Sequence, residues 1–598
     1  MVGDSEATDT HAKRSVVWGR RRLSRGLGTV AAAGLLLVGV APAMAAQQAS
    51  DTDGPNVRVI VMSQTKKGDA KDAGDKVRKH HGDVVDTLDI ADSVVADVSP
   101  DELAALAGDK GVVVVPNFPV SVAAASDLTG STRAPAAVFP STTGATAANT
   151  TMGLNGQGVT VAVLDTGITK LADFAGRVVG GVDLSGEGDP YKDSFGHGTF
   201  VSGLIAGNGA SSNGMYAGEA PKASLASIKV AGASGVTDLA TVISGVQWAV
   251  KNQKALNIGV LNISLGAVPF PSSVLNPLDQ AVEAAWNSGI VVVASAGNLG
   301  PTNGTITSPG DDPLVVTVGA LDDQGTAAPA DDTMTDFSSV GPTAVDGWFK
   351  PDLVTSGRSV VSLRVPGSTI DVANPSARVG DANFVGSGTS FSAAITSGAA
   401  AILRQSQPGA SPDKVKGKLL GGAMPGPVGS PFVDGFGSVN VLNATSVKAN
   451  LKQTAPTTAT PIPSTVSLFV TGAGSAWNGS AWNGSAWNGS AWNGSSWNGS
   501  AWNGSAWNGS AWNGSAWNGS AWNGSAWNGS AWNGSAWNGS AWNGSAWNGS
   551  AWNALLWDGS AWNGSAWNGS AWNGSAWNGS AWNGSAWNGS AWNGSAWN

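Results

Sequence analysis

Short apolar runs alternate with longer amphipathic segments over the middle of the chain. The apolar runs are rich in β-branched residues and end in turn-forming residues, which is typical of buried strands; they read VTVAVLD, LASIKV, IGVLNISL and IVVVAS. The segments between them, such as DLATVISGVQWAVKNQ and PLDQAVEAAWNSG, have the spacing of amphipathic helices. This alternation predicts an α/β domain with a mostly parallel sheet covered by helices on both faces, which we place at residues 151–446.

A smaller unit is predicted before this domain, at residues 46–121. It opens with an alternating strand pattern at 56–63 and continues with a polar helix, two short strands and a second helix. The second helix has Ser99 as its expected N-cap and Pro100 in its first turn. A last strand, GVVVVPNFPVSV, completes a βαββαβ order and predicts a ferredoxin-like α+β fold. Small and polar residues from 122 to 150 predict a lead-in or linker.

The first 45 residues have the pattern of an export signal. Four arginines between positions 20 and 25 precede the apolar run GLGTVAAAGLLLVGVAPAMA. Ala43 and Ala45 then form an A-x-A pattern, which predicts cleavage before Ala46. The alternative is an uncleaved membrane anchor, but glycine and Pro42 interrupt the run. The paired arginines leave general secretion and twin-arginine export both open.

Composition narrows the possible partners. The net charge is −9 without a basic patch, so nothing in the sequence favours nucleic acid binding. There is no cysteine, so an exported form must be stabilised without disulfides.

Three polar residues stand at predicted junctions between strands and helices. Asp165 follows a fully apolar strand, and His197 is the only histidine after residue 120 and stands at the start of a predicted helix. Ser390 follows Gly386 and Gly388 at the start of a helix of small residues. Each has a structural alternative, such as an N-cap for Ser390. A serine at a helix N-terminus is also placed where the helix dipole favours developing negative charge.

The order Asp, His, Ser at such junctions is one of the known orders of a catalytic triad. The sequence resembles the subtilisin-like serine proteases (subtilases, peptidase family S8) from about residue 158 to 444. The motifs that carry the resemblance are VAVLDTGI, HGTFVSGLIAG, LNISLG, VVVASAGN, FSSVGP, GTSFSAA and DGFGSVNVLNA. The unit at 46–121 resembles the inhibitor I9-like propeptide of that family by its element order and position.

The resemblance implies roles for individual residues. Ser390 is the expected nucleophile, His197 the general base and acid, and Asp165 the residue that orients His197. Asn298 is the expected side-chain donor to the oxyanion, although Asn298 also suits a turn beside Gly297. An extended substrate is expected to bind as an added strand, between the region of Gly235 on one side and Ser264, Leu265 and Gly266 on the other.

The sequence departs from the family pattern at Phe200, Ser356 and Ala394, none of which has a role in the expected chemistry. The chemistry needs no cofactor. Structural Ca²⁺ is common in the family, and four aspartates are candidate ligands without forming a readable ligand loop; they are Asp322, Asp323, Asp331 and Asp332.

The last part of the chain repeats the pentapeptide S-A-W-N-G. After a Pro/Thr-rich linker at 447–470, residues 471–598 carry 25 of the 29 tryptophans, one every five residues from Trp477 to Trp597. Asn-Gly in nearly every repeat is a turn signal and predicts a β-solenoid with one side per pentapeptide. The alternative is a low-complexity disordered tail. The repeats contain no acid–base pair, so we expect adhesion to cell wall or glycan, or a role as a spacer.

These observations predict a secreted serine endopeptidase (EC 3.4.21.-) made as a zymogen. Its partners would be protein or peptide substrates, its own propeptide as inhibitor, and for the tail a cell wall or glycan surface. The alternative is a non-catalytic surface adhesin that retains a protease-like scaffold. The presence of all four expected residues, Asp165, His197, Ser390 and Asn298, favours the enzyme.

Overall fold

The computed structural model describes residues 56–63, 69–109, 111–122, 137–267, 269, 272–455 and four short strands in the repeat region. The expected signal peptide lies outside these residues, as does most of the repeat region. Among the described helices, none is long and apolar enough to cross a membrane.

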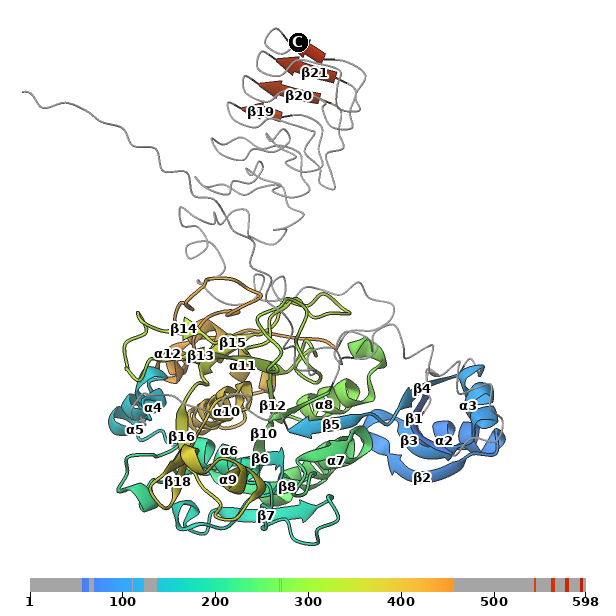
Figure 1. The fold of residues 1–598 in the computed structure, drawn as a ribbon, viewed down its shortest axis with the longest axis horizontal. Helices are drawn as coiled ribbons and strands as arrows, with labels where there is room; N and C mark the ends of the chain where they lie inside the picture. The colour runs from blue at the N-terminus through green and yellow to red at the C-terminus, as the bar shows by residue number, and fades with distance from the viewer. Residues whose placement is uncertain are drawn as a thin grey trace, which may run out of the picture.

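The N-terminal unit is a four-stranded antiparallel sheet with two helices (Figure 1). The strand order is β2-β3-β1-β4, and Val61, Val77 and Leu106 are fully buried in its core. Helix α3 starts with a capping box in which Ser99 and Glu102 bond each other's backbone N–H groups. In chain order the elements are β1 (Val57–Ser63), α2 (Ala70–Lys79), β2 (Asp83–Leu88), η1 (Asp89–Ala91), β3 (Ser93–Val98), α3 (Pro100–Ala107) and β4 (Val112–Pro116).

The central domain is built on an eight-stranded sheet with the order β14-β13-β12-β10-β6-β8-β7, and β15 pairs with β13. All pairings are parallel except that of β13 with β14. The inner strands are buried along their whole length, as the apolar runs predicted. Their bounds are β6 (Thr160–Asp165), β7 (Val178–Asp183), β8 (Ser224–Lys229), β10 (Ile258–Ile263), β12 (Val291–Ser295), β13 (Val316–Asp322), β14 (Thr333–Met334) and β15 (Leu353–Ser356).

Helices cover this sheet in two pairs, with α6 packed on α10 and α7 packed on α8 (Figure 1). The α/β prediction is therefore confirmed for this domain. The larger helices are α6 (His197–Ala206), α7 (Leu239–Leu256), α8 (Pro277–Asn287), α10 (Thr389–Ser406) and α11 (Pro412–Gly422), and the short helix α12 (Val441–Ser446) follows them. A separate small sheet, β16 (Val360–Leu363), β18 (Asn383–Gly386) and β17 (Arg378–Val379), leads into α10.

Two segments expected to be linkers are partly folded. Residues 137–155 form α4 (Phe139–Thr142) and α5 (Ala145–Met152), because Phe139 is buried in the core and Gly144 turns the chain with a positive φ between the two helices. Residues 447–455 run along α11 with Ala449 and Leu451 buried. Both segments consist mainly of small and polar residues, so the sequence did not indicate that Phe139, Ala449 and Leu451 are buried.

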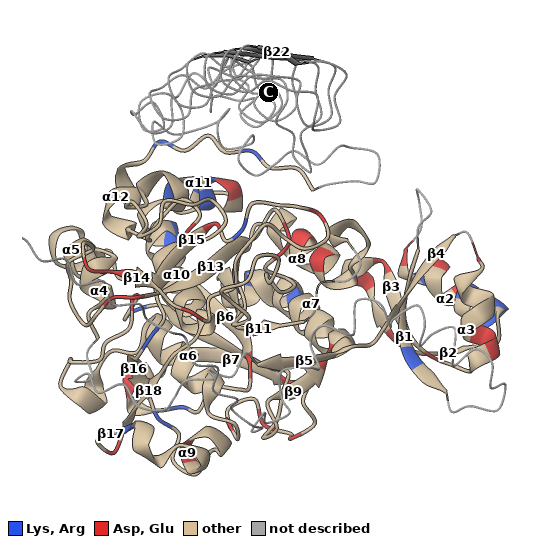
Figure 2. Ribbon diagram, turned by 45° about the horizontal axis from the view of Figure 1, so that its top comes forward, with Lys and Arg blue, Asp and Glu red and all other residues tan. Residues whose placement is uncertain are grey.

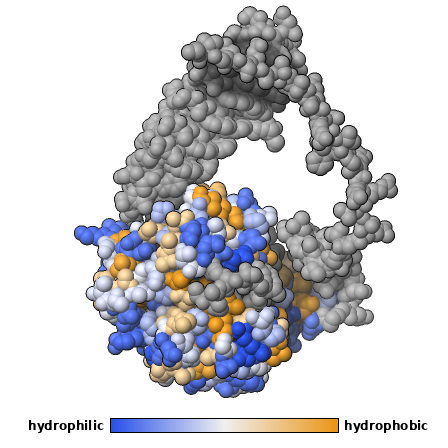
Figure 3. Space-filling model, turned by 60° about the vertical axis from the view of Figure 1, so that its left-hand side comes forward, coloured by the Kyte–Doolittle hydropathy of each residue, from blue (hydrophilic) through white to orange (hydrophobic). Residues whose placement is uncertain are grey.

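Acidic and basic positions are spread over the surface loops and helices (Figure 2). On the face that Figure 3 shows, apolar residues lie in small groups among polar ones. This distribution does not mark a large apolar docking surface on that face.

In the repeat region the four described strands form a parallel sheet. They are β19 (Trp542–Gly544), β20 (Ala561–Gly564), β21 (Ala576–Gly579) and β22 (Trp592–Gly594). The pairing is in register, so Trp562 lies opposite Trp577, and Trp577 lies opposite Trp592.

Candidate active site

The fold places Asp165 and His197 next to each other at the C-terminal edge of the sheet. Asp165 ends β6, an inner strand between β10 and β8, and His197 begins α6. The His197 Nδ1 atom lies 2.9 and 3.0 Å from the two carboxylate oxygens of Asp165. Both residues are buried. Because a carboxylate can only accept, Nδ1 carries the proton and Nε2 is left as the basic nitrogen. Nε2 has no hydrogen-bond partner within the described structure.

A second aspartate, Asp193, holds this pair in place. Its Oδ1 atom accepts hydrogen bonds from the Thr166 hydroxyl at 2.8 Å and from the Gly196 N–H at 2.7 Å, and its Oδ2 atom accepts from the Thr199 N–H at 2.7 Å. Burial raises the pKa of Asp193, and these bonds oppose that rise. The sequence interpretation overlooked Asp193; its only signal was its place four residues before His197.

Ser390 is the second residue of α10, where the first backbone N–H groups of a helix have no intrahelical partner. Its hydroxyl donates to the carbonyl of Ser264 at 3.2 Å, and its own carbonyl accepts from the Ser264 hydroxyl at 3.0 Å. The next residue, Phe391, has its ring centroid 5.6 Å from that of His197. Ser390 therefore lies in the neighbourhood of His197, with its hydroxyl directed to Ser264 in this state.

Asn298 is oriented by Thr389, the residue before Ser390. The Asn298 Oδ1 atom accepts hydrogen bonds from the Thr389 N–H and the Thr389 hydroxyl, both at 2.9 Å. This leaves the amide Nδ2 buried and without a partner within the described structure. A buried, unpaired donor costs free energy unless a ligand uses it. Its orientation suits a donor to a negatively charged oxygen beside Ser390.

Three of the four expected substrate-binding residues, Gly235, Leu265 and Gly266, contact a strand of the protein's own N-terminal unit, whereas Ser264 bonds Ser390. Strand β5 (Pro119–Val122) pairs antiparallel with β9 (Val236–Asp238) on one side and with β11 (Leu265–Gly266) on the other. The Val122 N–H also donates to the Gly235 carbonyl at 3.0 Å. Figure 1 shows β5 reaching from the N-terminal unit into the central domain. This is the added-strand geometry expected for an extended peptide.

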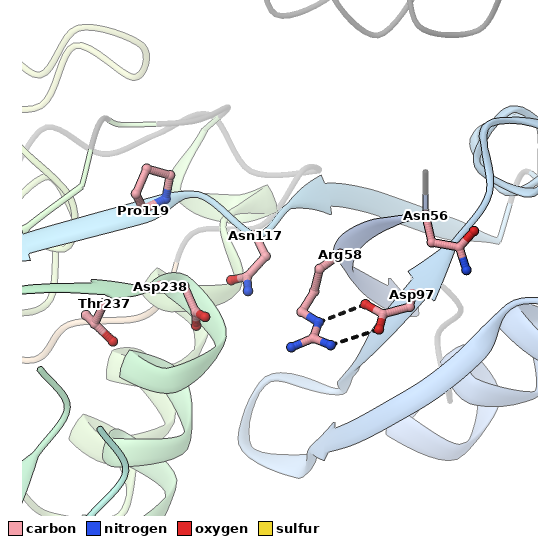
Figure 4. Close-up of a pocket in the computed structure, with 7 residues that line it drawn as sticks. All are labelled: Asn56, Arg58, Asp97, Asn117, Pro119, Thr237 and Asp238. Atoms are coloured by element: carbon pink, nitrogen blue, oxygen red, sulfur yellow. Dashed lines mark hydrogen bonds and ion pairs between the residues drawn. The ribbon is translucent and has the colours of Figure 1, made fainter. Parts of the chain in front are cut away.

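The segment before β5 caps helix α7. The Leu239 and Ala240 N–H groups donate to the Phe118 carbonyl at 3.0 Å and the Asn117 side chain at 2.9 Å. Beside this contact is a pocket of about 450 Å³ between the two units, shown in Figure 4. Inside it Arg58 makes a two-point ion pair with Asp97, at 2.8 Å for both bonds. The pocket is lined by Asn56, Arg58, Asp97, Asn117, Pro119, Thr237 and Asp238.

The described residues hold no group of three His, Cys, Asp or Glu side chains placed to bind a metal ion. Three of the four candidate calcium ligands instead stabilise turns. Asp322 and Asp323 accept from the backbone N–H groups of Gln324 and Gly325, and Asp331 accepts from the Thr326 hydroxyl. Structural Ca²⁺ at these residues therefore stays a prediction.

Comparison with known proteins agrees with this geometry. The model of the subtilase family (peptidase S8) matches residues 156–457, about half of the chain. The Serine protease AprX of Bacillus subtilis (strain 168) is 44% identical over 297 residues, which are 49% of this chain and 67% of the relative. Subtilisin Savinase of Lederbergia lenta is 35% identical over 294 residues, which are 49% of this chain and 93% of the relative. The chain therefore belongs to the subtilase family of serine proteases.

Proposed function

We propose that this protein is a serine endopeptidase that is made as a zymogen and exported. The observation that carries the proposal is the position of β5, which occupies the groove beside Ser390 as an extended strand hydrogen-bonded on both edges. A peptide substrate would bind in the same way, mainly through its backbone.

The proposed chemistry follows from the positions of four side chains. The Ser390 hydroxyl would turn away from Ser264 toward His197. His197 Nε2 would then remove its proton as the Ser390 oxygen attacks the scissile carbonyl. Asp165 would hold Nδ1 protonated and stabilise the imidazolium, which then protonates the leaving amine. Bond formation to the carbonyl carbon places negative charge on its oxygen. The free Nδ2 of Asn298 and the Ser390 N–H would stabilise that charge.

Residues 46–121 are proposed as the inhibitory propeptide. Apart from β5, the contacts with the central domain include the cap on α7 and a bond of 3.1 Å from the Ile90 N–H to the Gln247 side chain. The propeptide would thus stabilise α7 during folding and keep substrates out until it is cut. Residues 1–45 are proposed as the signal that directs the zymogen out of the cell.

The repeat region is proposed as a β-solenoid that attaches the enzyme to a cell wall or glycan surface. The in-register pairing repeats after 15 residues from β20 to β21 and from β21 to β22, and after 20 residues from β19 to β20, which corresponds to three or four pentapeptides in each coil. Stacked coils would align equivalent tryptophans along the solenoid.

Labelling with a serine-directed fluorophosphonate tests the enzyme. The secreted wild type is expected to label and to cleave casein, whereas Ser390→Ala does neither and keeps residues 46–121 attached. Equal labelling of both proteins would refute the assignment of Ser390. Absence of labelling in a fully matured wild type would favour the non-catalytic adhesin.

The tail is tested by comparing the full chain with a version that ends at residue 470. The difference between their far-ultraviolet circular dichroism spectra is expected to be that of β-structure, and only the full chain should sediment with purified cell walls. A random-coil difference spectrum would exclude the solenoid. Equal sedimentation of the two proteins would indicate that the tail is a spacer and does not bind cell walls.

A further inference from the structure

Four carboxyl groups gather inside the central domain, away from Asp165 and His197. Asp279 and Glu283 come from α8, where acidic positions are visible in Figure 2, and Asp311 and Asp312 come from the loop before β13. Asp279 and Asp312 are fully buried and Asp311 is 5% exposed. Each of the four has one buried oxygen without a hydrogen-bond partner in the described structure.

The charges around this cluster do not balance. Lys350 and Lys416 are the facing cations, and both bind Asp352, at 2.7 and 3.1 Å, and donate to the Val315 carbonyl at 2.9 Å. Asp346 adds a further carboxylate near Asp311, bound by Ser272 and Ser273. Six carboxyl groups, of which Glu283 and Asp346 are partly exposed, therefore face two ammonium groups, and unpaired charge on the buried members is costly.

Protons can remove this imbalance. Glu283 and Asp312 are placed to hydrogen-bond each other, and a bond between two carboxyls requires a proton on one of them. Burial and the neighbouring acids raise the pKa of Glu283 to about 9 and that of Asp311 to about 7. The four acids thus titrate as a coupled group that keeps shared protons near neutral pH and loses them as the pH rises.

The cluster is connected to the substrate groove through Ser308. The Ser308 hydroxyl donates to Asp279 Oδ1 at 3.0 Å, and its backbone exchanges two hydrogen bonds of 2.9 and 3.0 Å with Ala267, which follows β11 directly. The preceding residue, Thr307, donates its N–H to the Ala296 carbonyl at 3.0 Å. Its side chain fills the space between Gly266 and Gly297.

The loop from Thr307 to Asp312 therefore joins the buried carboxyls to the β11 side of the groove and to the segment that precedes Asn298. We propose that Asp279, Glu283, Asp311 and Asp312 act as a positioning group that holds shared protons, and that loss of these protons at alkaline pH loosens the loop and weakens substrate binding. Each lost proton passes to solvent and leaves an additional buried negative charge against α8.

The test compares Glu283→Gln with the wild type, both as matured enzyme. The glutamine keeps a hydrogen-bond donor toward Asp312 at every pH. Glu219→Gln is the matched control, because Glu219 is also buried with its pKa raised to about 8 but contacts Thr143 and not the groove. The readouts are the Tm of enzyme blocked with a fluorophosphonate and the KM for a peptide substrate, from pH 6 to pH 10.

Both variants should gain Tm relative to the wild type as the pH rises, by roughly 3 °C for each pH unit below the folded-state pKa. The KM of the wild type and of Glu219→Gln should rise above about pH 8, whereas that of Glu283→Gln should stay level. If Glu283→Gln does not accumulate, Asp279→Asn takes its place in the comparison.

A pH-independent Tm difference for Glu283→Gln, or the same KM profile in all three proteins, would overturn the proposal. EDTA is also added to both proteins. If it lowers the Tm of the wild type but not that of Glu283→Gln, the cluster binds a cation, and the proposal is overturned. The KM comparison rests on the proposed peptidase activity. The Tm comparison is repeated in the Ser390→Ala background, which needs neither maturation nor labelling, so failure of one is distinguishable from failure of the other.

Discussion

Val122, the last residue of β5, lies opposite Leu265 of β11, and Ser121 lies opposite Gly266. A peptide that continues in this antiparallel register places its next residue opposite Ser264, whose carbonyl accepts the hydrogen bond of the Ser390 hydroxyl. A chain that continues in this register would place the peptide bond after residue 123 at Ser390, the proposed nucleophile.

We predict that maturation cuts after Ala123, so that N-terminal sequencing of the secreted enzyme begins at Ala124. Ser390→Ala should remain uncut under the same conditions. A first cut before Val122 or beyond residue 130 would show that β5 does not bind in the register of a substrate.

Replacement of Asp165 by Asn should lower kcat by a factor on the order of 10⁴, because an amide in this position favours the wrong tautomer of His197. His197→Ala should lower kcat further, by a factor on the order of 10⁶, and the double variant should lose little more than His197→Ala, since the residues act as one unit. Rates measured at saturating peptide substrate check this prediction. If the loss in the double variant equals the product of the two single losses, Asp165 and His197 act independently.

Replacement of Asn298 by Ala should lower kcat by a factor on the order of 10²–10³ with little change in KM. That magnitude comes from the corresponding donor in a subtilisin rather than from this structure. Thr389→Val is the control, because it removes a hydroxyl bonded to Asn298 Oδ1 but leaves the free Nδ2 in place. Equal losses in the two variants would assign the effect to packing instead of charge stabilisation.

The sequence could predict the residues that are marked by a local signal, but not the groups whose members lie far apart along the chain. Asp165, His197 and Ser390 each follow from a local signal, the end of an apolar strand or the start of a helix. The buried carboxyl cluster is different. Asp279 and Glu283 on α8 are at least 28 residues from Asp311 and Asp312, and only tertiary packing brings the two pairs together. The sequence interpretation also missed Asp193, because its bonds to the N–H groups of Gly196 and Thr199 on either side of His197 are visible only in the folded loop.

Glu219→Gln should stabilise the protein increasingly as the pH rises. The pKa of Glu219 is raised from its usual value to about 8 by burial, so the folded state keeps a proton that the unfolded state releases above about pH 4.5. The wild type thus loses about 1.4 kcal/mol for each pH unit between these two values, and the glutamine does not. Urea unfolding of the blocked enzyme at pH 5 and pH 8 measures the difference. A constant difference would show that Glu219 is ionised in the folded state.

Asp352→Asn should destabilise the protein by about 3–5 kcal/mol, because Asp352 is the carboxylate that both buried lysines share. Lys416 has a pKa already lowered to about 8 by burial, so removal of its partner leaves a buried ammonium that must release its proton or remain uncompensated. The double variant Asp352→Asn with Lys416→Met removes one cation together with the anion and should recover part of the loss. Urea unfolding of the three proteins at pH 7 checks the order of stabilities. If the double variant is less stable than Asp352→Asn alone, the bonds of Lys416 to the carbonyls of Pro313, Leu314 and Val315 matter more than its pairing with Asp352.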